Sequence, residues 1–203
     1  MTMYEKVLEF MKKHDQATRE KFGIPDPDVV LLRVRLVIEE TAELCIALHK
    51  NDLIGIMDAC ADLRYVVVGT AIAYGLPSLE LFGTSEPGLK ASEAYQAGSW
   101  SKVIYFSRLN RLVNCLVHSM SNSLGMLSFS EFQEIGREIQ TEINEVLREI
   151  GYIDAMYQIP AKEVFAEVHR SNMTKNKLDK HSKGGKVGKK GFTAPDFKQF
   201  TKP

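Results

Sequence analysis

The stretch that decides the fold is LIGIMDACADLRYVVVGTAIAY, residues 53–74. Nearly every position in it is apolar, and its only charged residues are Asp58, Asp62 and Arg64. A helix that is apolar on every side is normally buried on every side. The pattern therefore predicts a central buried helix. Asp58 and Asp62 share one of its faces, because side chains four residues apart are neighbours on a helix.

Two carboxylates on one face of a buried helix carry a large energetic cost. Removing each unpaired ion from water costs free energy, and the two negative charges repel each other. Arg64 cannot pair with Asp62 within the helix, because residues two apart point in different directions. Protonation, a basic partner or a divalent cation could each offset the cost.

The preceding helix, predicted over residues 28–50, supplies more acids. Glu40 and Glu43 share a face, and Glu39 lies one turn before Glu43. The link to the next helix is very short, so the two helices are expected to pack antiparallel and bring their acidic faces together. Oxygen ligands without His or Cys favour Mg²⁺, with Mn²⁺ as a substitute. The predicted metal ligands are Glu40, Glu43, Asp58 and Asp62. The alternative, a solvated acidic stripe, suits a lone ExxE motif better than this pair of helices.

Cationic and amide side chains follow the last predicted helix, residues 161–173. Arginine offers phosphate a bidentate fork and lysine a mobile charge. The tail adds lysines among glycines, whose backbone N–H groups can approach an anion closely. The predicted substrate-binding residues are Arg170, Asn172, Lys175 and Lys190. The alternatives for the far tail are a solubilising end without fixed structure or a nonspecific contact with nucleic acid.

Charge is unevenly distributed although the net charge is zero. From Lys175 onward there are nine lysines and two aspartates, a net charge of +7, so the preceding 174 residues carry −7. An acidic body with a basic tail suits a site that gathers cations in one place and phosphates in another.

The three cysteines are isolated in apolar sequence, which argues against disulfides and zinc. The charged N-terminus and the lack of long apolar runs lead us to expect a cytoplasmic protein without a membrane partner.

The remaining helices are predicted over residues 3–22, 99–123 and 130–152, with residues 78–97 as an irregular connection. The sequence Glu142-Ile-Asn-Glu145, with Asp154 behind it, echoes the acids of the first helical pair. A decayed duplication would explain this echo. Surface acids at helical spacing are the preferred interpretation.

Several stretches together resemble the all-alpha NTP pyrophosphohydrolases, the group that includes MazG-like and phosphoribosyl-ATP pyrophosphohydrolase-like enzymes. The resemblance covers about residues 3–77 and 160–196, and the stretches that carry it are VLEFMKKHDQATREKFGIP, EETAEL, DACADLRYVVVGTAIAYGLP, EVHRSNMTK and GKVGKKGFTAPD. It implies an all-α antiparallel helical bundle of that type, with an inserted helical hairpin. One domain would span residues 1–174, with the insertion at about 78–159, and a basic tail would span residues 175–203.

The resemblance also implies an activity: Mg²⁺-dependent hydrolysis of a nucleoside triphosphate, in particular a dNTP, to the monophosphate and pyrophosphate. Glu40 and Glu43 take the ExxE positions, with Glu39 beside them as a further ligand or base, so that the catalytic residues are Glu39 and Glu43. Relatives lead us to expect a homodimer.

The chain departs from the family pattern in two places. Many relatives have ExxD in the second motif, which would put an acid where Ala59 stands, while Asp58 lies one residue earlier. The insertion could complete the bundle within one chain, build a dimer surface or form a wall of the base pocket.

Two other classes of function compete with this one. A helical protein could bind a nucleotide without cleaving it, and a helical protein could bind nucleic acid through the basic tail. The acidic body disfavours a stable nucleic-acid partner because it would repel a duplex. GKVGKK, residues 185–190, lacks the P-loop pattern and follows no predicted strand.

Overall fold

The computed structural model describes residues 1–77, 98–122, 128–176 and 191–201, and in these ranges it contains helices and no strand. The all-α fold class predicted from the sequence is confirmed. The elements are α1 (Met3–Lys13), α2 (Pro27–Lys50), α3 (Leu53–Tyr74), α5 (Gly98–Asn122), α6 (Phe129–Tyr157), α7 (Ala161–Met173) and a short 3₁₀ helix, η2 (Lys198–Phe200). None of these helices is both long enough and apolar enough to cross a membrane.

Helix α3 lies at the centre of the molecule. It packs against α1, α2, α6 and α7, and 16 of its 22 residues are buried. The α2–α3 link is formed by Asn51, in the left-handed conformation, and Asp52, whose carboxylate accepts from the backbone N–H of Gly55 at 3.1 Å. This link makes α2 and α3 an antiparallel hairpin, as predicted.

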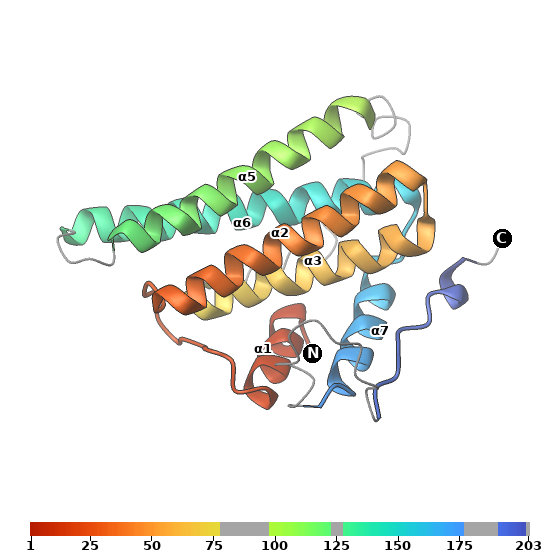
Figure 1. Ribbon diagram of the computed structural model, residues 1–203, viewed down its shortest axis with the longest axis horizontal. Helices are drawn as coiled ribbons and strands as arrows, with labels where there is room; N and C mark the ends of the chain where they lie inside the picture. The colour runs from red at the N-terminus through yellow and green to blue at the C-terminus, as the bar shows by residue number, and fades with distance from the viewer. Residues whose placement is uncertain (78–97, 123–127, 177–190, 202–203) are drawn as a thin grey trace.

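The hairpin α5–α6 packs against the hairpin α2–α3, while α1 and α7 lie together against α3 on its other side (Figure 1). Leu109, Leu112 and Leu116 of α5 are fully or almost fully buried in this packing. Of the three roles considered for the insertion, the observed packing corresponds to completion of the bundle within one chain.

The predicted first helix is too long. Helix α1 ends at Lys13, because Asp15 has a φ of 51° that an α-helix cannot accommodate. The chain then runs past the end of α3, where the backbone N–H of Arg19 donates to the carbonyl of Ile72 and that of Gly23 donates to the carbonyl of Tyr74. Partners on a distant helix, rather than a local helical pattern, determine this segment.

The prediction that the acids Glu142, Glu145 and Asp154 lie on the surface is wrong for Glu142 and Asp154, whereas Glu145 is partly exposed. Glu142 is 3% exposed and pairs with Arg111 of α5 at 2.7 Å, and Asp154 is buried and pairs with Arg64 of α3. Arginines therefore neutralise these acids. The partner of Arg64 comes from a helix 90 residues away, which local spacing could not reveal.

The described end of the chain is held in place by contacts with α7. Residues 191–201 lie along α7, the backbone N–H of Asp196 donates to Glu167 at 2.8 Å, and Phe197 is 5% exposed. Apart from η2, these residues form a loop without regular secondary structure, and the buried side chain of Phe197 anchors it. Most of the Lys/Gly stretch before them lies outside the described residues.

Among the glycines that the structure describes, Gly75 leaves the least room for a side chain. It ends α3 with a φ of 65°, and a Cβ there would lie 2.1 Å from the carbonyl oxygen of Lys21. We expect Gly75→Ala to lower the free energy of unfolding by about 2–3 kcal/mol, because both the conformation and the clash oppose it. Urea unfolding followed by circular dichroism measures the change. The matched control is Gly151→Ala within α6, where nothing lies within 4 Å and stability should rise by about 0.5–1 kcal/mol. Equal stability of Gly75→Ala and the wild type would contradict this account.

Candidate active site

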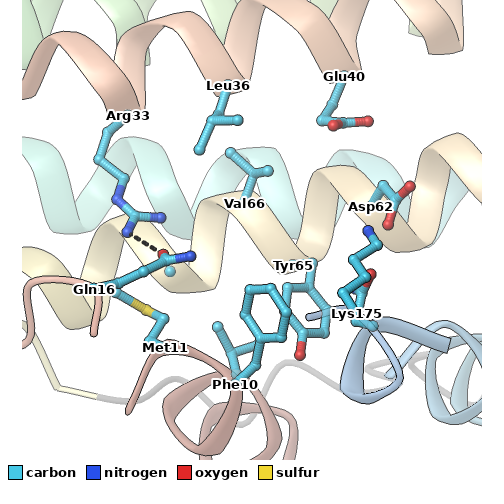
Figure 2. A pocket seen from close by; sticks show the side chains of 13 residues that line it. Phe10, Met11, Gln16, Arg33, Leu36, Glu40, Asp62, Tyr65, Val66 and Lys175 are labelled. Atoms are coloured by element: carbon cyan, nitrogen blue, oxygen red, sulfur yellow. Dashed lines mark hydrogen bonds between the residues drawn. The ribbon is translucent and has the colours of Figure 1, made fainter. Parts of the chain in front are cut away.

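A pocket of about 190 Å³ lies between α2, α3, α1 and the end of α7. Figure 2 shows Glu40 reaching into it from α2, Asp62 from α3 and Lys175 from the segment after α7. Asn172 lines the same end. Four of the residues predicted as ligands for metal or substrate therefore meet in one pocket.

The carboxylates at this end strongly influence one another. Burial is the main cause that raises the pKa of Glu40 to about 8. The negative charges of Asp62, Glu43 and Asp58 raise this pKa further. The positive charge of Lys175 lowers it. Burial also raises the pKa of Asp62 to about 7, with the charge of Asp58 as the second cause. The pKa of Asp58 is raised by burial and then by Glu43.

Glu40 carries a further signal. Its Oε2 atom is buried and has no hydrogen-bond partner within the described part of the chain. A buried acceptor without a partner costs about 1–3 kcal/mol. A cation or a donor on a ligand would remove this cost. Oxygen-only side chains of this kind are the ligands that Mg²⁺ prefers.

The four acids are nevertheless not arranged as a finished coordination shell. Among the described residues, no three candidate ligands converge closely enough to hold a metal ion. Glu43 is exposed, whereas Glu40 and Asp62 are half-buried in the pocket wall. Glu43 and Asp58 are linked to the pocket acids by charge rather than by lining the pocket themselves.

Glu39 lies on a different face from the acidic cluster. It is more than half exposed, and Arg35 pairs with it at 3.4 Å along α2. Consecutive residues of a helix point about 100° apart, so Glu39 and Glu40 cannot both face α3. The structure does not bring Glu39 together with the other predicted acids.

Arg170 does not line the pocket either. Its guanidinium donates to Glu167 at 2.9 and 2.6 Å and to the carbonyl of Ala194 at 3.1 Å. Glu167 lies three residues earlier on the same helical face, which makes it the nearest partner. In this arrangement Arg170 fastens the C-terminal segment to α7. Lys190 lies outside the described residues.

A side-chain network fixes the end of α7 beside Asp62. The hydroxyl of Tyr65 lies 3.0 Å from Nδ1 of His169, and Nε2 of the same histidine lies 3.4 Å from Glu9 of α1. Burial lowers the pKa of His169, which favours the neutral ring. A tautomer with the proton on Nε2 then accepts from Tyr65 and donates to Glu9. Lys13 also donates to the carbonyl of Met173. These contacts position Asn172 and Lys175.

The opposite end of the pocket is lined by Arg33 and Gln16, with apolar residues between the two ends (Figure 2). Neither residue is among those predicted from the sequence. The available signal was spacing, since Arg33 lies seven residues before Glu40 and a seven-residue step returns to nearly the same helical face.

The raised pKa values predict a pH dependence of the metal-free protein. The folded state holds protons on Glu40 and Asp62 that the unfolded chain releases near pH 4. Because the folded state binds more protons, the free energy of unfolding should fall as the pH rises from about 4 to about 8. Urea unfolding in EDTA at several pH values tests this. The double variant Glu40→Gln/Asp62→Asn should show a shallower slope, and an equal slope in both proteins would refute the assignment.

Comparison with known proteins agrees with the observed fold. Residues 4–84 match the phosphoribosyl-ATP pyrophosphohydrolase family. The chain is also 32% identical over 183 residues to an uncharacterized protein of Acanthamoeba polyphaga mimivirus, which covers 86% of this chain and 71% of that protein. No solved structure gives a significant match. The chain therefore belongs to the all-alpha NTP pyrophosphohydrolase superfamily, as a pyrophosphohydrolase of nucleotide-like substrates.

Proposed function

We propose that this protein hydrolyses a nucleoside triphosphate, in particular a dNTP, to the monophosphate and pyrophosphate with the help of Mg²⁺. The observation that carries the proposal is the partnerless, buried Oε2 of Glu40 among three further carboxylates. This concentration of negative charge lies beside Lys175 and Asn172, whose side chains can donate to phosphate oxygens.

The residues present fit a divalent cation. The ligands would be Glu40, Glu43, Asp58 and Asp62. When bound, Mg²⁺ or its substitute Mn²⁺ would supply Lewis acidity and would neutralise charge on the phosphates. Asp58 serves in this proposal in place of the acid that many relatives have at position 59.

The protein's own side chains then account for positioning and proton transfer. Glu43, exposed beside the pocket acids, accepts a proton from water as the water oxygen bonds to phosphorus. The bond between the α-phosphorus and the oxygen that bridges it to the β-phosphate breaks. Its electron pair stays on that oxygen, which leaves as part of pyrophosphate. Lys175 stabilises the charge that develops there, while Asn172 donates to a phosphate oxygen. Glu39, Arg170 and Lys190 remain predicted contributors for which the described geometry supplies no pocket contact.

A homodimer is part of the proposal. Helix α2 exposes three large apolar side chains, Leu31, Ile38 and Ile46, each more than half exposed. An exposed apolar stripe of this kind is typical of an interaction surface.

The decisive experiment incubates the protein with each dNTP and NTP in Mg²⁺ and measures pyrophosphate and monophosphate. Equal amounts of the two products support the proposal. Tight nucleotide binding without either product would instead support a regulatory nucleotide-binding protein. Release of single phosphates would contradict the proposed position of cleavage.

A further inference from the structure

The end of the pocket opposite the acids holds a buried cation. Arg33 of α2 is 3% exposed, and its Nη2 donates to Oε1 of Gln16 at 2.8 Å (Figure 2). Within the described part of the chain, no carboxylate lies within ion-pair distance of Arg33. The residues that the structure describes therefore supply no counter-charge for it.

Arg33 also has unused hydrogen-bonding capacity. Its Nε atom is buried and finds no acceptor among the described residues. Burial lowers the pKa of Arg33 to about 10, so the side chain is still protonated at neutral pH. A buried charge and a buried N–H without partners are both costly. A ligand that brings acceptor atoms to the guanidinium would offset the cost of its charge.

Gly69 of α3 leaves the space that this guanidinium occupies. A Cβ at position 69 would lie 2.8 Å from Nη1 of Arg33, so any other residue would push the guanidinium aside. Glycine is otherwise unfavourable in the interior of a helix, by roughly 1 kcal/mol relative to alanine. The glycine that makes room for Arg33 therefore lowers the intrinsic helix stability of α3.

The two polar ends are separated by a distance that suits a nucleoside. Arg33 and Glu40 are seven residues apart on one face of α2, a rise of about 10.5 Å. Between them the pocket is lined by apolar and aromatic side chains, including Leu36, Val66 and Phe10. Phosphates held at the acidic end would therefore place the sugar and base between these walls, with the base directed toward Arg33.

The polar groups that face the ligand at this end of the pocket are hydrogen-bond donors. Arginine can only donate, so the oxygen of Gln16 must face it, and the amide NH₂ of Gln16 is left as a second donor group. A 6-oxopurine presents two adjacent acceptors, O6 and N7, that match an arginine fork. Adenine presents an amino donor beside N7, which would oppose the donors of Arg33 and Gln16.

We propose that Arg33 and Gln16 form a base-recognition subsite that selects 6-oxopurine nucleotides, those of guanine or hypoxanthine, over adenine nucleotides. This inference rests on the proposed function, because that function places the phosphates at the other end of the pocket. It assigns substrate specificity to two residues that take no part in the phosphate chemistry.

Calorimetry with monophosphates, which are products and are not consumed, tests the subsite directly. In Mg²⁺, dGMP and dIMP should bind about tenfold more tightly than dAMP, which lies within the range of about 5- to 150-fold for a good bidentate contact. The 7-deaza analogue of dGMP, which lacks the N7 acceptor, should lose most of this advantage. Inorganic tripolyphosphate, which has no base, reports on the phosphate end alone.

Two variants and one control locate the effect. Arg33→Met should abolish the preference for dGMP over dAMP and leave tripolyphosphate binding within about twofold, because it removes donors only at the base end. Gly69→Ala retains the charge but displaces the guanidinium, so it should reduce the preference even if Arg33→Met fails to fold. The control Arg35→Met changes an exposed arginine on the same helix and should retain the full preference.

Four results would overturn the inference, and a fifth would overturn only the proposed function. Equal binding of dGMP, dIMP and dAMP would do so, as would tighter binding of dCMP than of dGMP, which would indicate a different acceptor pair. Loss of tripolyphosphate binding in Arg33→Met would make Arg33 a phosphate ligand instead. Pyrophosphate release from all dNTPs without base preference would refute the subsite but leave the proposed function intact. Base-selective binding without pyrophosphate release would refute the function and leave the subsite.

Discussion

Asp62→Asn is expected to lower the rate of pyrophosphate release by more than about 100-fold, which is the upper range for losing even an outer partner of a metal ligand. Asparagine keeps the shape of the side chain but not the charge that would hold a cation. The same change should raise the free energy of unfolding in EDTA by at least about 1 kcal/mol, because a pKa raised to about 7 shows that the folded state disfavours the carboxylate. Activity and stability should therefore move in opposite directions.

Pyrophosphate assays and urea unfolding measure the two effects on the same preparation. Glu134→Gln is the matched control, since Glu134 is an exposed acid on α6 that pairs only with its neighbour Arg137 among the described residues. It should leave both quantities close to the wild type. An Asp62→Asn protein that turns over nucleotide at the normal rate would remove Asp62 from the site.

Asp154→Ala is expected to lower the free energy of unfolding by about 3–5 kcal/mol, because it leaves the buried Arg64 without its partner. Arg64 is on α3 and Asp154 on α6, so this ion pair joins the helix of the acidic cluster to the α5–α6 hairpin. The side chains are 5% and 9% exposed. Burial raises the pKa of Asp154 although Arg64 opposes the shift, which indicates that the pair itself is costly to bury.

Denaturant unfolding of two further variants separates the loss of a contact from the exposure of a charge. Glu134→Ala removes one partner of a surface pair and should cost less than about 1 kcal/mol. The double variant Arg64→Met/Asp154→Leu should recover most of the stability lost in Asp154→Ala, because the two apolar side chains can pack together without leaving a buried charge unpaired. A cost below about 1 kcal/mol for Asp154→Ala would mean that water or another group compensates Arg64.

The core of the fold was accessible from local sequence alone. The apolar character of residues 53–74 predicted a helix buried on all sides, and α3 has these bounds. The short break at Asn51 and Asp52 predicted the hairpin with α2. Both features depend on interactions between near neighbours in the chain, which periodicity and capping residues report directly.

The acidic end of the pocket could also be predicted from local sequence. Helical spacing and a tight link were enough to predict that Glu40 and Asp62 would face each other, and both line the pocket. Spacing was less informative for Glu39, because it identifies residues on a shared face but not the face that is turned inward. In the structure Glu39 pairs with Arg35 away from the pocket.

Only the tertiary structure decided which charges are compensated. Asp154, Glu142 and Arg170 have ordinary helical spacing, yet the first two are buried against arginines of other helices and the third is held by Glu167 and Ala194. Arg33 shows the opposite case, a buried cation with no acidic partner among the described residues; its spacing from Glu40 places it on the same face of α2 but does not reveal that its charge is uncompensated. The sequence by itself determined the helices, the buried position of α3 and the acids that meet beside it, because these follow from periodicity over a few turns. Compensation of a charge depends on side chains brought together from distant parts of the chain, and desolvation exists only once those parts are packed.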